Sequence, residues 1–345
     1  MAASFASNRT ARTRHMGGDN MHKLSRRGFL GTAAVLGAAL PLTAVRADPY
    51  PSRPIRLITP NSAGSSVDKL ARRVGDHLNR GLGTAVVVEN IPGAGGIIGT
   101  ERLISSPPDG YTLALVAKNH IIIPLVNTAV RYDALKQVTP VCTVLESCGV
   151  LAARPGFPAK TAADLIAYAR QYPGKVNFGS SGVGTSVDLQ GRVLQQIGGI
   201  DVVNVAYRGV SALVPDLMSG VVDVAFFGLS AVSEQIHAGS LTGLGITRPQ
   251  RLAAFPDIPP IAESVPGYSF SGWYALIAPA GLDASIAQRL SDEIARLQAD
   301  PSFVEMAARE GEAPMSMTGV QLAEFMAQES RDIAALVKSA DIRIS

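Results

Sequence analysis

Two short stretches decide the fold expected for this chain: Gly64-Ser65-Ser66-Val67-Asp68 and its near copy Gly184-Thr185-Ser186-Val187-Asp188. Each follows an expected strand (55–59 and 176–179) and opens an expected helix (67–78 and 187–197). Where a strand runs through a Gly/Ser loop into a helix, backbone N–H groups, hydroxyls and the helix dipole form a site for an anion. Either stretch alone would be explained as an ordinary helix N-cap. Their repetition predicts two lobes that close on one small anionic ligand.

The length and composition suit a large folded protein. The chain has 345 residues, of which 47% are hydrophobic and 17% charged, enough for a large core and two domains. The net charge is +3, but seven of the 31 basic residues and one of the 28 acidic residues lie in the first 47. The remainder, with 24 basic and 27 acidic residues, is slightly acidic and has no Lys/Arg cluster with interleaved aromatics, so we expect no nucleic-acid partner.

The first 47 residues read as an export signal. Ser25-Arg26-Arg27-Gly28-Phe29-Leu30 carries a twin arginine, an apolar run extends to Leu42, and Val45-Arg46-Ala47 predicts cleavage before Asp48. Because Met21 stands where such signals usually begin, we expect translation to start there, with residues 1–20 as an over-long start. An uncleaved anchor is the alternative. No later segment is long and apolar enough to span a bilayer, so we expect a mature protein in the periplasm that is not membrane-embedded.

The two cysteines, Cys142 and Cys148, lie in one apolar stretch. If residues 139–153 form a continuous strand, the two are about 20 Å apart at ~3.3 Å per residue, too far for a disulfide. We therefore predict buried free thiols. A disulfide is the alternative, and it would require a break in the strand, for example at Ser147 or Gly149.

The first half of the chain alternates strands and helices. Strands over 84–89 and 111–117 flank a glycine-rich turn, Pro92 to Gly99, and a helix that ends near Ser105. This β-α-β-α-β pattern predicts a parallel sheet covered by helices. The glycine run reads G-x-G-x-x-x-G, and Lys118-Asn119-His120, not an acid, ends the next strand, so a dinucleotide site is not indicated. A tight turn is the simpler interpretation, with a role at a cleft edge as the alternative.

The second half repeats the alternation. Residues 139–153 are expected to cross from one lobe to the other, and Thr161-Ala162-Ala163-Asp164 resembles a capping box. Further strands are expected over 202–205, 222–227, 244–247 and 271–278, and helices over 162–171, 211–218, 231–238, 283–299, 301–310 and 318–339. We predict lobe 1 over residues 48–148 and 270–345, and lobe 2 over residues 149–269. Each lobe is expected to be a mostly parallel sheet flanked by helices, joined by a hinge.

Catalytic and metal chemistry find little support in the sequence. Residues 179–186 have the spacing of a phosphate-binding loop, but Thr185 stands where the lysine is required. There is no G-x-S-x-G elbow, and no His or Cys spacing that suits a metal. Loop serines could act as nucleophiles only with a base beside them. We therefore expect no enzyme activity, no cofactor and no metal.

Four further residues are candidates for binding, and two of them, Arg208 and Asp223, also have a structural interpretation. His120 lies just past a strand end, on the expected cleft side. Arg208 would pair with a carboxylate if it faces the cleft, and is a surface arginine otherwise. Tyr207 could offer its hydroxyl or its ring edge. Asp223 could meet a ligand ammonium, although a turn cap is the simpler role.

From about Tyr50 onward, the chain resembles the substrate-binding proteins of tripartite tricarboxylate transporters, the Bug-type extracytoplasmic solute receptors. The matching pieces, in order, are Gly64 and Asp68 before Leu70-Ala71-Arg72, Pro92-Gly93-Ala94-Gly95-Gly96 with Gly99, Pro108-Asp109-Gly110-Tyr111-Thr112-Leu113, Gly182 and Gly184, Tyr207-Arg208-Gly209, Gly220 with Val222-Asp223, Pro259 with Glu263, and Ala278-Pro279-Ala280-Gly281. The resemblance implies a two-lobed periplasmic-binding-protein fold (type II-like). It also implies a carboxylate held by the two helix-start loops.

The chain departs from the family beside those loops. Ser65 stands where a second glycine is usual, Asp188 replaces a frequent histidine, and Arg208 replaces a frequent lysine. Asn61-Ser62-Ala63 replaces a run that usually contains proline. The added acid at Asp188 could favour a ligand that bears an amine.

The sequence therefore predicts a monomeric periplasmic receptor that binds a small carboxylate and docks on membrane transporter subunits. A sensor accessory that reports to a membrane kinase, and a secreted α/β enzyme with a loop serine, are the alternatives. The expected ligand-binding residues are Asn61, Ser62, Gly64, Ser65, Ser66, Asn119, His120, Ser180, Ser181, Gly184, Thr185, Ser186, Tyr207, Arg208 and Asp223.

Overall fold

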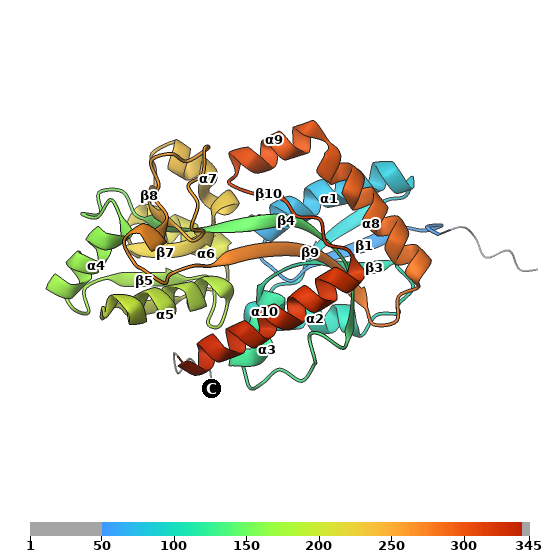
Figure 1. Cartoon of the computed structure of the whole chain (residues 1–345), viewed down its shortest axis with the longest axis horizontal. Helices are drawn as coiled ribbons and strands as arrows, with labels where there is room; N and C mark the ends of the chain where they lie inside the picture. The colour runs from blue at the N-terminus through green and yellow to red at the C-terminus, as the bar shows by residue number, and fades with distance from the viewer. Residues whose placement is uncertain (1–49, 340–345) are drawn as a thin grey trace, which may run out of the picture. The chain divides into compact units, whose positions relative to one another are not determined.

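The computed structural model describes residues 50–339. Its ten strands form one hydrogen-bonded sheet in the order β2-β1-β3-β9-β4-β7-β5-β6, with β8 and β10 each paired to β4 (Figure 1). The strands are β1 (Ile55–Thr59), β2 (Val86–Asn90), β3 (Thr112–Ala117), β4 (Val138–Ala153), β5 (Asn177–Ser180), β6 (Val203–Ala206), β7 (Val224–Gly228), β8 (Thr242–Ile246), β9 (Ser271–Pro279) and β10 (Ala313–Pro314).

Ten α-helices and two short 3₁₀ turns are described. The helices are α1 (Ser66–Leu82), α2 (Ile97–Ile104), α3 (Asn119–Val126), α4 (Ala162–Gln171), α5 (Ser186–Gly198), α6 (Val210–Ser219), α7 (Leu229–His237), α8 (Ala284–Ala299), α9 (Pro301–Arg309) and α10 (Gly319–Ser339), and the 3₁₀ turns are η1 (Ala94–Gly96) and η2 (Ile261–Glu263). Across residues 50–339, none of the helices is both long enough and apolar enough to cross a bilayer.

The long strand β4 changes partners along its length. Val138–Cys148 pairs with β9, whereas Gly149–Ala153 pairs with β7 and β8. In Figure 1, β4 and β9 run side by side between two groups of strands, with β1 and β3 at one end and β5 and β7 at the other. The predicted crossover over residues 139–153 is thus one continuous strand shared by both groups.

The parallel arrangement predicted from the β-α alternation is present in both groups. β1 pairs in parallel with β2 and β3, and β5 pairs in parallel with β6 and β7. β4 and β9 are antiparallel to their neighbours, so each group is a mixed sheet and the prediction of mostly parallel sheets is too simple. The alternation pattern cannot reveal this, because it does not specify the direction of the shared strands.

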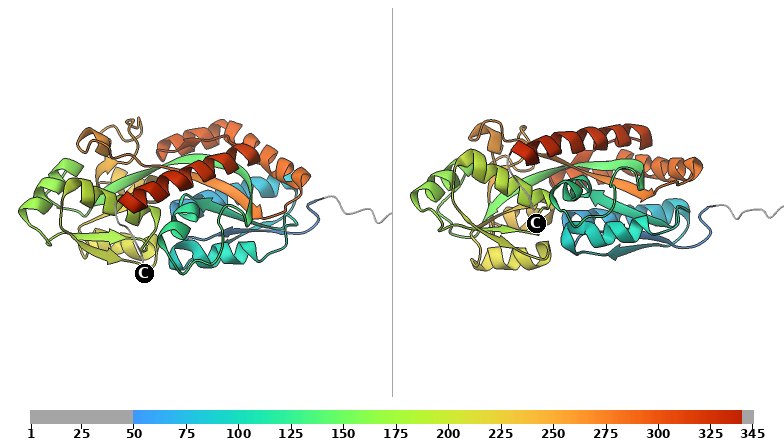
Figure 2. Two further views of the ribbon diagram at one scale, coloured as in Figure 1. Left: turned by 60° about the horizontal axis from the view of Figure 1, so that its bottom comes forward. Right: turned by 90° about the horizontal axis from the view of Figure 1, so that it is seen from below.

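The core explains why α1 forms where it does. Leu70, Val74 and Leu78 are fully buried against β1, as their spacing on one helix face predicts. The helix extends four residues further than expected, because Gly81 continues it and Gly83, with φ of 68°, ends it. At the other end of the chain, α10 packs against α3 and β4 (Figure 2).

The capping box and the two free thiols agree with the sequence, whereas one short helix does not. The capping box at Thr161 is present, with bonds from Asp164 N to Thr161 Oγ1 (3.1 Å) and from Thr161 N to Asp164 Oδ2 (2.9 Å). Cys142 and Cys148 are buried free thiols in β4, as predicted. α3 was not predicted, and it carries Pro124 in its interior.

Candidate functional site

The strand ends on one side of the sheet surround a cavity of about 670 Å³. Its lining comes from four loops, within residues 60–65, 92–96, 181–185 and 206–210, together with Asn119 and Asn127. These loops follow the carboxyl ends of β1, β2, β5 and β6, and Asn119 lies just beyond β3. Open α/β sheets bind ligands at this edge, because the connections leave a crevice there.

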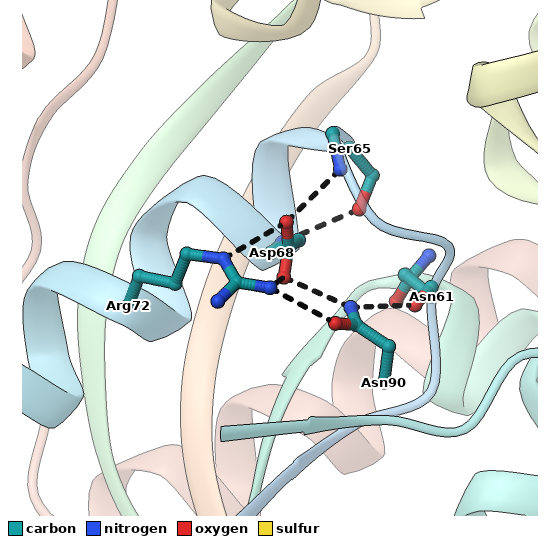
Figure 3. A network of polar contacts seen from close by, with 6 residues as sticks. Asn61, Ser65, Asp68, Arg72 and Asn90 are labelled. Carbon is teal, nitrogen blue, oxygen red and sulfur yellow. Dashed lines mark hydrogen bonds and ion pairs between the residues drawn. The ribbon is translucent and has the colours of Figure 1, made fainter. Parts of the chain in front are cut away.

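The start of α1 is organised by Asp68, as Figure 3 shows. Ser65 is the N-cap, and its hydroxyl accepts from Asp68 N at 3.3 Å. The Asp68 carboxylate accepts from Gly64 N (2.9 Å) and Asn90 Nδ2 (2.9 Å), and it pairs with Arg72. Asn90 also donates to the carbonyl of Asn61 at 3.1 Å, so this network fixes the loop that lines the cavity.

Asp68 is held ionised by these contacts. Burial raises the pKa of its carboxyl, but the hydrogen bonds from Gly64 N, Asn90 and Arg72 outweigh burial and leave the pKa below the usual value. The Asp68 carboxylate therefore accepts from Gly64 N, a donor that was predicted to bind the ligand. Gly64 does not line the cavity, so the structure does not place it where it was predicted to bind ligand.

The start of α5 has the same bonding pattern. Thr185 is the N-cap and accepts from Asp188 N, while Gly184 N donates to Asp188 Oδ2 at 2.9 Å. Arg192 Nε also donates to that carboxylate, at 2.9 Å. The N–H of Gly184 is therefore also taken by an acid of the same helix start, and Gly184 does not line the cavity. Asp188 lines none of the cavities described here, so its added acid does not present a charge to a ligand.

Backbone donors nevertheless remain at both helix starts. Within the described residues, the N–H groups of Ser66, Val67 and Val187 make no hydrogen bond. All three residues line a smaller cavity of about 100 Å³. It shares Asn61, Ser65, Asn119, Ser181 and Val210 with the large cavity. We call the two cavities the outer and the inner cavity.

Arg208 gives the outer cavity its charge. Among the described residues that line it, Arg208 is charged and the others are not. The side chain is exposed, and no ion pair or hydrogen bond engages it within residues 50–339. An unpaired guanidinium in a cavity favours an anion and, because of its planar fork, a carboxylate.

Tyr207 also lines the outer cavity, but its hydroxyl is engaged. It donates to Asp216 Oδ2 at 2.7 Å. Burial, with a further contribution from Asp216, raises the pKa of the Tyr207 hydroxyl to about 12. The hydroxyl of Tyr207 is therefore not free for a ligand, and its bond to Asp216 of α6 positions the loop before that helix.

The predicted residues divide into clear groups. The outer cavity brings together Asn61, Ser62, Ser65, Asn119, Ser181, Thr185, Tyr207 and Arg208. Ser66 and Ser186 line the inner cavity. Ser180 is buried in β5, where its carbonyl accepts from Tyr207 N at 2.8 Å, and it lines neither cavity.

His120 is not a residue of the outer or inner cavity, contrary to prediction. It is buried, its Nε2 lies 2.8 Å from the carbonyl oxygen of Ala134, and it borders a narrow side cavity of about 10 Å³. Burial lowers the pKa of His120 to about 4, despite the opposing bond with Ala134. The strand end predicted by sequence continues into α3, which turns this side chain into the protein.

Asp223 lies at the opposite end of the sheet from the cavity, before β7 begins. It pairs with Arg154 Nε at 2.7 Å and accepts from Asn177 N at 2.9 Å. It therefore ties the ends of β4, β5 and β7 together. Asp223 lines neither cavity, and its bonds match the turn-cap role that was the simpler interpretation.

One part of the lining was predicted only as an alternative, and another part was not predicted at all. Gly93 to Gly96 border the outer cavity, with φ of 70° at Gly95 and 113° at Gly96, as the cleft-edge alternative allowed. Gln190 lines the inner cavity, is buried, and has an Oε1 atom without a hydrogen-bond partner among the described residues. Its position one turn into α5, four residues after Ser186, was the available signal. Among residues 50–339, no group of three or more His, Cys, Asp or Glu could hold a metal ion.

Comparisons with known proteins agree with this geometry. The model of the family described as "Tripartite tricarboxylate transporter family receptor" matches residues 70–342. Protein BugT of Bordetella pertussis is 33% identical over 319 residues, which cover 92% of this chain and 96% of that protein.

Solved structures of periplasmic binding proteins are also similar to this chain. The periplasmic binding protein BugD superposes with a TM-score of 0.82 at 27% identity, covering 85% of this chain and 99% of BugD. Rpa4515 of R. palustris, solved with adipate, superposes with a TM-score of 0.83 at 27% identity, covering 85% and 99%. These similarities identify a two-lobed periplasmic-binding-protein fold. The chain thus belongs to the tripartite tricarboxylate transporter receptor family, whose members are solute receptors and not enzymes.

Proposed function

We propose that this protein captures a small organic carboxylate between two lobes in the periplasm and delivers it to a tripartite tricarboxylate-type membrane transporter. Lobe 1 comprises residues 48–148 and 270–345, and lobe 2 comprises residues 149–269. The change of β4 partners between Cys148 and Gly149 supports this division. The mature protein acts as a monomer.

The unpaired Arg208 side chain in the outer cavity carries this proposal. A ligand carboxylate would accept from its guanidinium and from backbone N–H groups at the starts of α1 and α5. No acidic side chain among the described lining residues opposes an anion there. The adipate in Rpa4515 supports a carboxylate, because that protein shares the fold at 27% identity.

The strength of binding is reasonable for such a site. Micromolar affinity requires about −8 kcal/mol. Several charge-assisted hydrogen bonds of ~1.5–3 kcal/mol each would supply much of that before ordering costs are subtracted. Closure of the lobes expels water and strengthens each of these interactions.

The predicted export signal lies outside the described residues. The twin-arginine-type signal peptide over residues 1–47 would direct the folded protein to the periplasm. Cleavage before Asp48 would leave the whole described region in the mature receptor.

Native mass spectrometry of the mature protein, purified from periplasm without denaturation, tests the ligand class first. We expect a bound organic acid, whose mass narrows its identity. A thermal-shift screen of mono-, di- and tricarboxylates, aromatic acids and amino acids follows, and at least one acid should raise the melting temperature. An empty protein that no acid stabilises would contradict the proposal.

A further inference from the structure

A hydrogen bond at the inner cavity joins two residues that follow distant strands of the sheet. Ser186 N, at the start of α5, donates to the side-chain oxygen Oδ1 of Asn119 at 2.5 Å. Asn119 opens α3 directly after β3, whereas Ser186 follows β5. Strands β9, β4 and β7 separate β3 from β5 in the sheet, so this bond joins its two halves through a side chain.

Asn119 occupies the boundary between the two cavities. It lines both the outer and the inner cavity, and Ser186 lines the inner one. On its other side, the Ser186 hydroxyl lies 3.4 Å from Gln190 Nε2, and the Oε1 atom of Gln190 has no partner among the described residues. The bond therefore stands where a bound molecule would contact both halves of the protein.

The bond to Asn119 occupies one backbone N–H at the start of α5 and leaves the following N–H free within residues 50–339. Ser186 N is taken by Asn119, whereas Val187 N makes no hydrogen bond within the described residues. A ligand anion can therefore bind the helix start without displacing Asn119. The amide is a neutral acceptor, so it caps Ser186 without placing a fixed negative charge beside the ligand.

The two faces of the cavity also approach elsewhere. A Cβ atom at Gly209 would lie 2.6 Å from Ser62 Oγ, and one at Gly95 would lie 3.7 Å from Thr185 Cγ2. Asn119 differs from these steric contacts, because it supplies a directional bond between the halves.

We propose that Asn119 is a positioning residue that clasps the two halves of the binding site together. The clasp thereby raises the affinity for every ligand by the same factor. The effect on affinity rests on the proposed receptor function, whereas the clasp itself does not. A ligand that binds one conformation loses affinity in proportion to the population of that conformation. Removing the clasp lowers that population whatever acid is bound.

Hydrogen exchange at the Ser186 amide tests the clasp without any ligand. Asn119→Ala should speed exchange at Ser186, because no other acceptor among the described residues contacts this N–H. Asn119→Asp retains an oxygen at the same position and should keep the amide protected. Asn204→Ala is the matched control, because it removes the amide bonds between Asn204 and Gln195 of α5, away from the cavities. It should leave Ser186 unchanged.

Calorimetry with adipate and succinate as probes tests the consequence. In Asn119→Ala, both affinities should fall by the same factor, about three- to tenfold, from the loss of one hydrogen bond. In Asn119→Asp, both should fall although Ser186 remains protected, because the new charge repels the acids. Unchanged exchange in Asn119→Ala would overturn the clasp, and a loss confined to one acid would make Asn119 a ligand contact instead. If wild-type protein binds no acid in any screen, the receptor proposal fails, and exchange still decides the clasp.

Discussion

The hydroxyl of Ser230, in the first turn of α7, donates to Oε1 of the buried Glu312 at 2.7 Å. Ser230 belongs to the segment that follows β7, whereas Glu312 directly precedes β10. Tyr274 of β9 donates to the same oxygen at 3.3 Å, and Lys69 of α1 donates to the Ser230 carbonyl at 2.8 Å. Glu312 thus lies where both halves of the sheet meet.

The buried Glu312 predicts a specific pH dependence of stability. Burial raises the pKa of Glu312 to about 8; the Ser230 bond, Tyr274 and Arg73 lower it and the charge of Glu310 raises it. Between pH 4.5 and about 8 the folded protein holds a proton that the unfolded chain has released, so stability falls as pH rises through this window. Glu312→Gln should therefore raise the free energy of unfolding at pH 9 by about 1–3 kcal/mol.

Urea unfolding of wild type and Glu312→Gln at pH 5, 7 and 9 measures this difference. The gap between the two proteins should widen with pH. Glu305→Gln, at an exposed site on α9, should show no such trend. A constant gap across the series would mean that Glu312 does not take up this proton.

Asp68 predicts the opposite dependence. Its folded pKa is lowered, so its stabilisation is present above the unfolded value of 3.8 and is lost as pH falls through the folded value. Asp68→Asn should cost about 1–3 kcal/mol at pH 7, because Gly64 N and Arg72 lose a charged acceptor. The cost should shrink at pH 3. Asp76→Asn on the exposed face of α1 is the control, and an equal loss in both variants would refute the role of this network.

The two helix starts were predictable because their bonds are local. At each start, the hydroxyl of the N-cap (Ser65 or Thr185) accepts from the N–H of the acid three residues later. Sequence spacing alone therefore indicates the arrangement. The same locality explains an error. The acids bond back to Gly64 N and Gly184 N, four residues earlier, and so occupy donors that the sequence assigned to the ligand.

His120 and Asp223 were misplaced for a different reason. Their partners, the Ala134 carbonyl and Arg154, lie 14 and 69 residues away along the chain. Only the paths of α3 and β4 bring those partners close. The antiparallel direction of β4 and β9 is equally a property of the folded sheet, and no local pattern encodes it.

Arg208 provides the most direct test of the ligand's charge. Arg208→Gln should weaken binding of the acid found in the screen by about 10- to 100-fold, because one charge-assisted contact is worth about 1.5–3 kcal/mol. The wild-type affinity should also fall as salt is raised, and the variant should be less salt-sensitive. Arg80→Gln removes the same charge from an exposed position on α1 and should leave the affinity unchanged. Equal affinities in Arg208→Gln and wild type would exclude Arg208 from the site.

Gly209 predicts a defect that a second substitution repairs. Its φ of 129° disfavours any side chain, and a Cβ atom would lie 2.6 Å from Ser62 Oγ across the outer cavity. Gly209→Ala should therefore push the two faces apart and weaken acid binding by about tenfold or more. Ser62→Gly removes the clashing side chain, so the Gly209→Ala/Ser62→Gly pair should bind more tightly than Gly209→Ala, even though Ser62→Gly alone loses a cavity hydroxyl. Calorimetry on the four proteins gives the coupling energy, and strictly additive losses would show that backbone strain at residue 209, and not contact with Ser62, causes the defect.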